Sequence, residues 1–301
     1  MSTSTSTGGG AVPDPDKPGP FATETITETI QVQATNHSVP IRCVYPTSGP
    51  DAGPYPVVVV SHGFQIPASQ YNGYVDRLAS FGYVALTADF PTGFTANNVA
   101  NAEDVLAAVD WAAAKPALAG IADATNVGLT GHSLGGKVSL LASTMDTRVK
   151  ASITLDPVDG AMNCSPQNCP DVSKLMPIPI PTGFIGETLD KTGGSFGMAC
   201  APAADNYETF YAGTSAPSLS VTVNGANHMS FIDDVVGCGF ICNFCNTATA
   251  QNATVNALSK AFVTAFYERW LKGRVEYDAY LTGDLAKTKY VDTGLVTIAS
   301  K

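Results

Sequence analysis

Apolar and polar positions along the chain follow two periods, one typical of strands and one of helices. Near the N-terminus they alternate, which favours strands at residues 25–33 and 39–45, joined at Asn36-His37-Ser38. Residues 56–61 (PVVVVS) form a continuous β-branched run, typical of a strand that a parallel sheet buries on both faces. Further strands are predicted at residues 83–89, 149–155, 178–187 and 218–223.

Apolar residues recur at helical spacing in segments between and after these strands. The spacing predicts helices at residues 69–81, 100–115 and 252–271, with Gly82 and Gly273 as stops after the first and last. Strands and helices succeed one another from residue 56 to 145, which implies right-handed crossovers. The sequence therefore predicts an α/β fold: a mainly parallel central sheet flanked by helices on both faces.

The expected organisation is one α/β domain over residues 21–301, because 301 residues with 45% hydrophobic content can bury one large core. Residues 1–20 are rich in Ser, Thr, Gly and Pro, and they lack the apolar side chains that would offset the entropy of ordering. This composition predicts that residues 1–20 form a disordered leader, in which no secretory signal is visible. Residues 161–206 are mostly Cys-, Pro- and Gly-rich loops and are candidates for a lid or insert.

The charge pattern narrows the class of partner. The net charge is −10 and the pI is near 4.7, with no cluster of Lys and Arg, so a nucleic-acid partner is not expected. A neutral or apolar substrate is favoured. No apolar run approaches the roughly 18 residues that a membrane helix needs, so no integral membrane segment is predicted. We expect the protein to act as a monomer.

Six of the seven cysteines lie in loop-like sequence in the second half of the chain. This placement favours disulfides and an oxidising or extracellular compartment. Cys238, Cys242 and Cys245, with Cys200 as a fourth ligand, are a weaker candidate for zinc, because no histidine follows them. We predict neither a metal nor a cofactor.

Residues 126–136 (NVGLTGHSLGG) carry the clearest chemical motif. A short apolar strand runs into Gly-x-Ser-x-Gly and then into a helix-forming segment, which is the pattern of a nucleophile elbow. Gly131 and Gly135 leave room where strand and helix nearly touch, and Gly136 lets the helix pack closely. Ser133 is therefore the candidate nucleophile.

A serine nucleophile needs a base, and the chain has four histidines. His37 lies in the early hairpin, His62 begins the loop after the first central strand, and His132 is the variable residue of the elbow, pointing away from the reactive face of Ser133. By elimination His228 is the base. Its place after the last predicted strand fits the order Ser, acid, His of α/β-hydrolases.

The acid that orients this histidine should follow a strand between Ser133 and His228. Four carboxylates qualify: Asp156, Asp159, Glu187 and Asp190. Asp156 follows its strand immediately, whereas Glu187 closes the next strand, the commoner site for the acid in this fold. Spacing alone leaves the choice open.

The oxyanion hole should combine two backbone N–H groups. One belongs to Leu134, the residue after the nucleophile. The other comes from the loop after the first central strand, His62-Gly63-Phe64, in which Phe64 is the candidate donor.

Together these motifs resemble the chlorophyllase branch of the α/β-hydrolases, from about residue 40 to 235. The resemblance rests on residues 61–64 (SHGF), 131–136 (GHSLGG), 155–160 (LDPVDG) and 228–234 (HMSFIDD), with the segment 200–210 before the histidine. In that family the triad acid stands in the Leu-Asp-Pro segment, so the resemblance implies Asp156 as the acid. Plant chlorophyllases usually have Arg after the nucleophile and Asp after His-Met, where this chain has Leu134 and Ser230.

The resemblance implies a cofactor-free carboxylic ester hydrolase with the triad Ser133, His228 and Asp156. Its substrate would be an ester of a long apolar alcohol, such as the phytyl ester of chlorophyll. Phe64, Val158, Met229 and Phe231 are the candidate substrate-binding residues. Polyester hydrolases and platelet-activating-factor acetylhydrolases have a similar elbow and loop, so a polyester or lipid ester is the alternative. A non-catalytic binding protein of the same fold is a second alternative.

Overall fold

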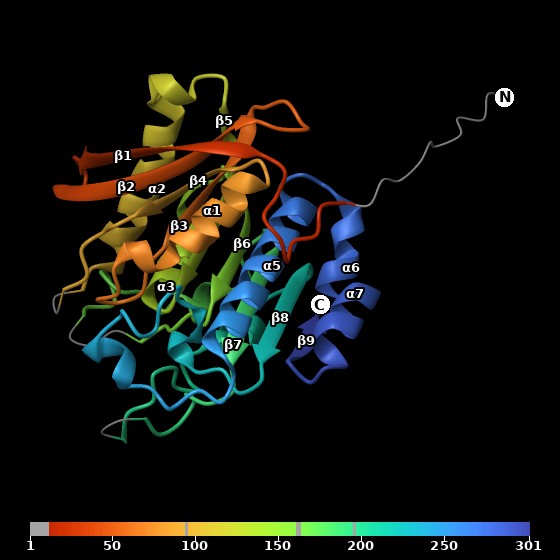
Figure 1. The fold of residues 1–301 in the computed structure, drawn as a ribbon. Helices are drawn as coiled ribbons and strands as arrows, with labels where there is room; N and C mark the ends of the chain where they lie inside the picture. Colours follow the sequence, from red (N-terminus) through yellow and green to blue (C-terminus); the bar gives the residue numbers. More distant parts are fainter. Residues whose placement is uncertain (1–11, 94–95, 161–163, 195–196) are drawn as a thin grey trace.

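The computed structural model describes residues 12–93, 96–160, 164–194 and 197–301. Within these ranges, nine strands form one sheet in the order β1-β2-β4-β3-β5-β6-β7-β8-β9 (Figure 1). Their bounds are β1 Ala22–Val32, β2 His37–Ser48, β3 Tyr55–Ser61, β4 Val84–Ala88, β5 Ala122–His132, β6 Val149–Leu155, β7 Thr182–Glu187, β8 Ser218–Val223 and β9 Val296–Ser300.

The six central strands, which are β4, β3, β5, β6, β7 and β8 in sheet order, run parallel, and β1, β2 and β9 pair antiparallel at the two edges. The mainly parallel sheet that the sequence predicts is thus confirmed. The run Val57–Val60 lies in β3, and all four of its side chains are buried. Val58 and Val60 face one core, whereas Val57 and Val59 face the other, as the period of two in a strand requires.

Helices cover both faces of this sheet (Figure 1). Helices α1 and α5 contribute to the core on one face, and α2, α3 and α4 contribute to the core on the other. The helices are α1 Asn72–Ser80, α2 Asn98–Ala114, α3 Leu134–Met145, α4 Tyr207–Ala212, α5 Asn252–Trp270, α6 Asp278–Leu281 and α7 Asp284–Ala286. Shorter turns are η1 Ala68–Tyr71, η2 Pro116–Leu118, η3 Ser173–Leu175, η5 His228–Phe231, η6 Phe240–Asn243, η7 Val275–Tyr277 and η8 Lys287–Val291.

The segment before β1 differs from the predicted leader. Residues 12–20 pack against the C-terminal region: Lys289 bonds to both Asp14 and Asp16, and the Tyr277 hydroxyl donates to the Pro13 carbonyl. The leader prediction is therefore wrong for residues 12–20, and residues 1–11 lie outside the described part. A composition argument counts apolar side chains in the segment alone, so it misses ion pairs to a distant partner.

Six cysteines form three disulfides, Cys164–Cys169, Cys200–Cys245 and Cys238–Cys242, and Cys43 is a buried free thiol. The disulfide interpretation is confirmed. The four sulfurs of the zinc alternative are in disulfide bonds and are not available as thiolate ligands. The three bonds are consistent with an oxidising compartment.

The topology gathers several loops at one edge of the sheet. Because parallel strands end at the same edge, the residues after β3, β5, β6, β7 and β8 meet there. The candidate lid of residues 161–206 starts from this edge, although residues 161–163 and 195–196 lie outside the described part. Within the described ranges, no helix has the length and apolar character needed to span a bilayer.

Candidate active site

Ser133 stands at the turn between β5 and α3, in a conformation that side chains rarely adopt. Its φ is 56° and its ψ is −122°. A Cβ on Gly131 would lie 2.3 Å from the Gly135 carbonyl oxygen, and one on Gly135 would lie 2.4 Å from that of Ser61. Glycine is therefore required at both positions, as the sequence predicts. The turn is a nucleophile elbow, and the strained backbone presents a partly exposed Ser133 side chain.

Ser133, His228 and Asp156 form one hydrogen-bonded row. The Ser133 Oγ lies 2.8 Å from Nε2 of His228, whose Nδ1 lies 2.6 Å from Oδ2 of Asp156. Asp156 is fully buried and His228 is 4% exposed, so this pair is shielded from water on the side away from the serine. With Nδ1–H donated to the carboxylate, Nε2 can accept the hydroxyl proton.

The charge around His228 sets its protonation. Burial by itself lowers the pKa of this imidazole, but the hydrogen bond to Asp156 and the negative charges of Asp156, Asp190 and Glu187 raise it above its ordinary value. The surroundings thus stabilise the imidazolium that forms when His228 takes a proton. This is the direction that general-base catalysis by a histidine requires.

Of the four carboxylates that the sequence leaves open, only Asp156 bonds to the His228 ring. Asp159 pairs with the buried Lys137 at 2.9 Å and accepts the N–H groups of two loop residues. Glu187 accepts the N–H groups of Leu189 and Asp190. Asp190 accepts the backbone N–H of His228 itself at 2.7 Å. Each of the other three therefore shapes a loop.

His132 and Tyr71 connect the loops around the site. Nε2 of His132 donates to the carbonyl of His228 at 2.8 Å, so its Nδ1 accepts from the Tyr71 hydroxyl at 2.7 Å. That hydroxyl also accepts the N–H of Gly63 at 3.2 Å. Burial, together with the charge of His228, holds the pKa of His132 well below its ordinary value. No sequence signal marks Tyr71, since its role depends on contacts 8 and 61 residues away.

The two candidate oxyanion donors lie on adjoining segments. Leu134 begins α3, so its N–H has no acceptor within the helix and lies at the positive end of the helix dipole. Phe64 lies in the loop after β3, and the contact of Gly135 with Ser61 and His62 brings that loop against the start of α3. His62 is buried and stacks on Phe90, in keeping with a structural role.

The candidate substrate-binding residues divide into two groups. Phe64 and Val158, like Leu134, are partly exposed. Met229 and Phe231 are buried, and the Phe231 ring lies 6.0 Å from the ring of His132. Phe231 is fully buried beside His132 and therefore offers no surface to a substrate.

An elbow serine bonded to a histidine and an aspartate, on a mainly parallel sheet of this topology, defines an α/β-hydrolase with a serine nucleophile. The family model "Chlorophyllase" matches residues 16–287. The chain therefore belongs to the chlorophyllase family, whose named relatives are ester-hydrolysing enzymes, and it is a serine carboxylic ester hydrolase.

Curated relatives carry two kinds of name. Chlorophyllase-1 of Arabidopsis thaliana is 26% identical over 268 residues, which cover 82% of each chain. Chlorophyllase type 0 of Chenopodium album is 22% identical over 293 residues, covering 85% of this chain and 82% of the relative. Bis(hydroxyethyl) terephthalate hydrolase of Streptomyces coelicolor is 29% identical over 243 residues, covering 76% of this chain and 72% of the relative.

Proposed function

We propose that this hydrolase cleaves the ester of a long apolar alcohol, with chlorophyll as the substrate and chlorophyllide and phytol as the products. Ser133, His228 and Asp156 are its triad. The observation that carries this assignment of the triad is the row Ser133–His228–Asp156, with distances of 2.8 and 2.6 Å.

The reaction proceeds through an acyl-enzyme. Ser133 Oγ attacks the ester carbonyl as His228 Nε2 takes its proton, and the N–H groups of Phe64 and Leu134 stabilise the oxyanion. The intermediate collapses, and the leaving alcohol takes the proton from His228. Water, deprotonated by His228, then attacks the acyl-enzyme, and the acid leaves as Ser133 regains its proton. Asp156 keeps the imidazole in the required tautomer throughout.

The family match over residues 16–287 and the relatives named chlorophyllase support a pigment ester. The apolar, partly exposed Phe64, Leu134 and Val158 beside Ser133 are compatible with an apolar substrate. The net charge of −10 disfavours strongly anionic substrates. We also propose that the chain acts as a monomer. The pairing of its six second-half cysteines supports an oxidising or extracellular compartment.

A terephthalate or other polyester-type ester is the second candidate. The relative named bis(hydroxyethyl) terephthalate hydrolase supports it. So do Leu134 and Ser230, which stand where plant chlorophyllases usually carry charged residues.

The test measures both substrates with one preparation. Chlorophyll a in detergent micelles is incubated with the wild-type protein and with Ser133→Ala, and chlorophyllide is quantified by liquid chromatography. Bis(hydroxyethyl) terephthalate is assayed in parallel. We expect chlorophyllide from the wild type and none above background from Ser133→Ala. Terephthalate turnover without chlorophyllide would replace the first substrate by the second, and equal activity of Ser133→Ala would reject the mechanism.

A further inference from the structure

The backbone of His228 is held by side chains from distant parts of the chain. His228 begins η5, a turn of only four residues after β8. Its N–H donates to Oδ2 of Asp190 at 2.7 Å, and its carbonyl accepts from Nε2 of His132 at 2.8 Å. The bonds within this turn run between Asn227 and Ser230. Asp190 and His132 therefore hold the main chain of His228 itself, from which the imidazole extends.

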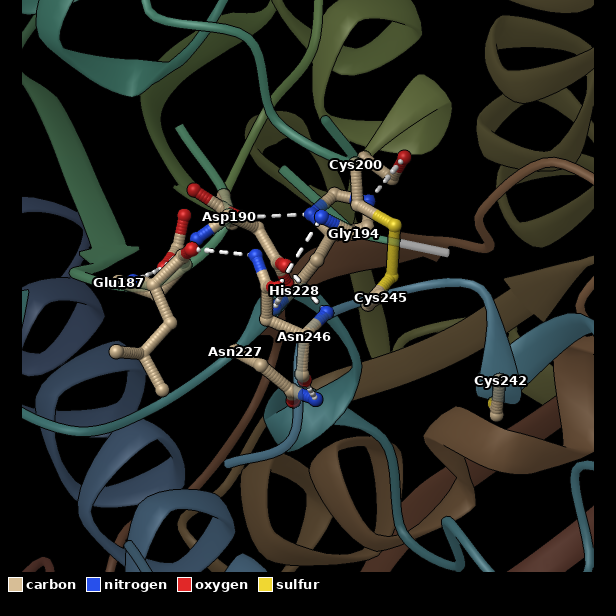
Figure 2. The surroundings of a disulfide bond; sticks show 12 residues. Glu187, Asp190, Gly194, Cys200, Asn227, His228, Cys242, Cys245 and Asn246 are labelled. Carbon is tan, nitrogen blue, oxygen red and sulfur yellow. Dashed lines mark hydrogen bonds and ion pairs between the residues drawn. A yellow bond between two sulfur atoms is a disulfide. The ribbon is translucent and has the colours of Figure 1, made fainter. Parts of the chain in front are cut away.

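Asp190 joins three segments at this point (Figure 2). Besides His228, it accepts the N–H of Asn246 on Oδ1 at 2.7 Å, and its own carbonyl accepts the N–H of Ala201 at 3.1 Å. Asn246 in turn accepts from the side chain of Asn227, the residue before His228, at 2.6 Å. Asp190 is fully buried, so each of its carboxylate oxygens depends on these N–H donors in place of water.

A disulfide links two of the segments that bond to Asp190. Cys200 precedes Ala201, and Cys245 precedes Asn246; their bond links residues 45 positions apart (Figure 2). The two sulfurs and a carboxylate oxygen of Asp190 all lie within 4.8 Å of one another. The bond therefore holds the two segments that carry partners of Asp190 next to it.

We propose that Asp190 is a positioning residue for His228 and that the Cys200–Cys245 disulfide keeps Asp190 in place. The inference rests on the proposed catalytic role of His228. Without this unit, the N–H of His228 loses its partner and the start of η5 can shift by a fraction of an ångström. Misplacing a catalytic group by about 1 Å can cost on the order of 10²-fold in rate.

Asp190 also contributes charge. Its carboxylate helps to raise the pKa of His228, so its removal should lower that pKa. The titratable groups that face His228 are Asp156 after β6, Glu187 at the end of β7, Asp190 itself and His132 at the end of β5.

The test compares three variants with the wild type on a chromogenic short-chain ester. They are Asp190→Asn, the double variant Cys200→Ser/Cys245→Ser, and the matched control Cys164→Ser/Cys169→Ser. The control removes a disulfide from the loop that bonds to the start of α2 through Asn168 and Val99. For each variant, kcat, KM, the pH profile of kcat/KM and thermal unfolding are measured.

We expect Asp190→Asn to lower kcat by about 10- to 100-fold with KM nearly unchanged, and to move the acidic limb of kcat/KM to lower pH. The Cys200/Cys245 double variant should lower kcat without moving that limb, because the Asp190 charge remains. The Cys164/Cys169 control should keep the wild-type kcat. A wild-type kcat and acidic limb in Asp190→Asn would overturn the proposal. So would a loss of kcat in Asp190→Asn that follows its thermal stability alone, without a shift of the limb.

Ser133→Ala separates this inference from the proposed function. If Ser133→Ala is inactive and Asp190→Asn behaves as the wild type, the triad stands and only the positioning role fails. If Ser133→Ala is active, the proposed function itself fails.

Discussion

The His228–Asp156 pair and the His37–Asp104 pair have the same Nδ1 to Oδ2 distance, 2.6 Å, and both carboxylates are fully buried. They differ in where the nearby hydroxyl bonds. Ser133 Oγ bonds to the imidazole of His228, whereas the Thr35 hydroxyl donates to the Asp104 carboxylate at 2.6 Å. A histidine oriented by an aspartate is thus not in itself a catalytic site.

The surroundings explain the difference. Ser133 is presented by a strained elbow beside the first N–H groups of α3, whereas Thr35 lies in the β1–β2 turn. The His37 side chain is 27% exposed, against 5% for His228. Asp104, on α2, ties the hairpin turn to that helix. The first pair faces the side chain of the proposed nucleophile, and the second connects two elements of the fold.

The largest expected effect separates the two hydroxyls. Ser133→Ala should lower kcat for a chromogenic ester by roughly 10⁴- to 10⁶-fold, because the covalent step is lost. Thr35→Ala should leave kcat unchanged, because among the described residues its hydroxyl bonds only to Asp104 and to the N–H of His37. Steady-state kinetics of both purified variants checks this. A loss of turnover in Thr35→Ala would contradict the structural role of the His37–Asp104 pair.

The next effect separates the two carboxylates. Asp156→Asn should lower kcat by about 10⁴-fold, because an amide favours the wrong imidazole tautomer. Asp104→Asn should keep kcat but lower the free energy of unfolding by about 1–3 kcal/mol, since a buried hydrogen-bonded group loses part of its partners. Urea unfolding and kinetics on the same samples decide it. Comparable kcat values for the two variants would contradict our assignment of the acid.

Glu187 adds a stability effect in the neighbourhood of the first pair. Burial and then the charge of Asp156 raise the pKa of Glu187 from 4.5 to about 7. Between these values the folded protein keeps a proton that the unfolded chain has lost, so this group's contribution to stability falls as pH rises from 4.5 to 7.

Glu187→Gln removes this dependence. As the pH rises from 4.5 to 8, the free energy of unfolding of the variant should therefore increase relative to that of the wild type by up to roughly 3 kcal/mol. The measurement is urea unfolding of both proteins at several pH values. Parallel stability curves for the variant and the wild type would show that Glu187 titrates normally.

The smallest effect is a shift of the pH profile. Since the pKa of His228 is raised, the acidic limb of kcat/KM should lie above the ordinary histidine value, with activity falling about tenfold per pH unit below it. Asp104→Asn should not move this limb. A limb at or below the ordinary value would show that the charges of Asp156, Asp190 and Glu187 do not act on His228 as described.

Local signals allowed much of the fold to be predicted. The bounds of the predicted strand 56–61 and helix 252–271 lie within one or two residues of those of β3 and α5. In both segments the pattern of buried apolar residues determines the secondary structure. The strand predicted at 178–187 is observed only from Thr182. Helix α4, strand β9 and the short C-terminal helices were not predicted: α4 and the C-terminal helices are each a few residues long, and β9 pairs with β8 across 73 or more positions.

The candidate site also has parts that depend on local sequence and parts that depend on distant contacts. The elbow is formed by consecutive residues, so its glycines are recognisable in the sequence. The acid cannot be identified locally, because four carboxylates follow strands and the fold is needed to show which one reaches the imidazole ring. Tyr71, Asp190 and the Cys200–Cys245 pairing depend on contacts between distant loops, and no pattern within one segment encodes those.

The most direct measurement is covalent labelling with a fluorophosphonate probe, followed by peptide mapping with mass spectrometry. We predict an adduct on Ser133, with loss of ester hydrolysis in proportion to labelling, and strongly reduced labelling in His228→Ala. Active protein that carries no adduct, or inactivation by an adduct on another residue, would contradict the assignment of Ser133 as the nucleophile.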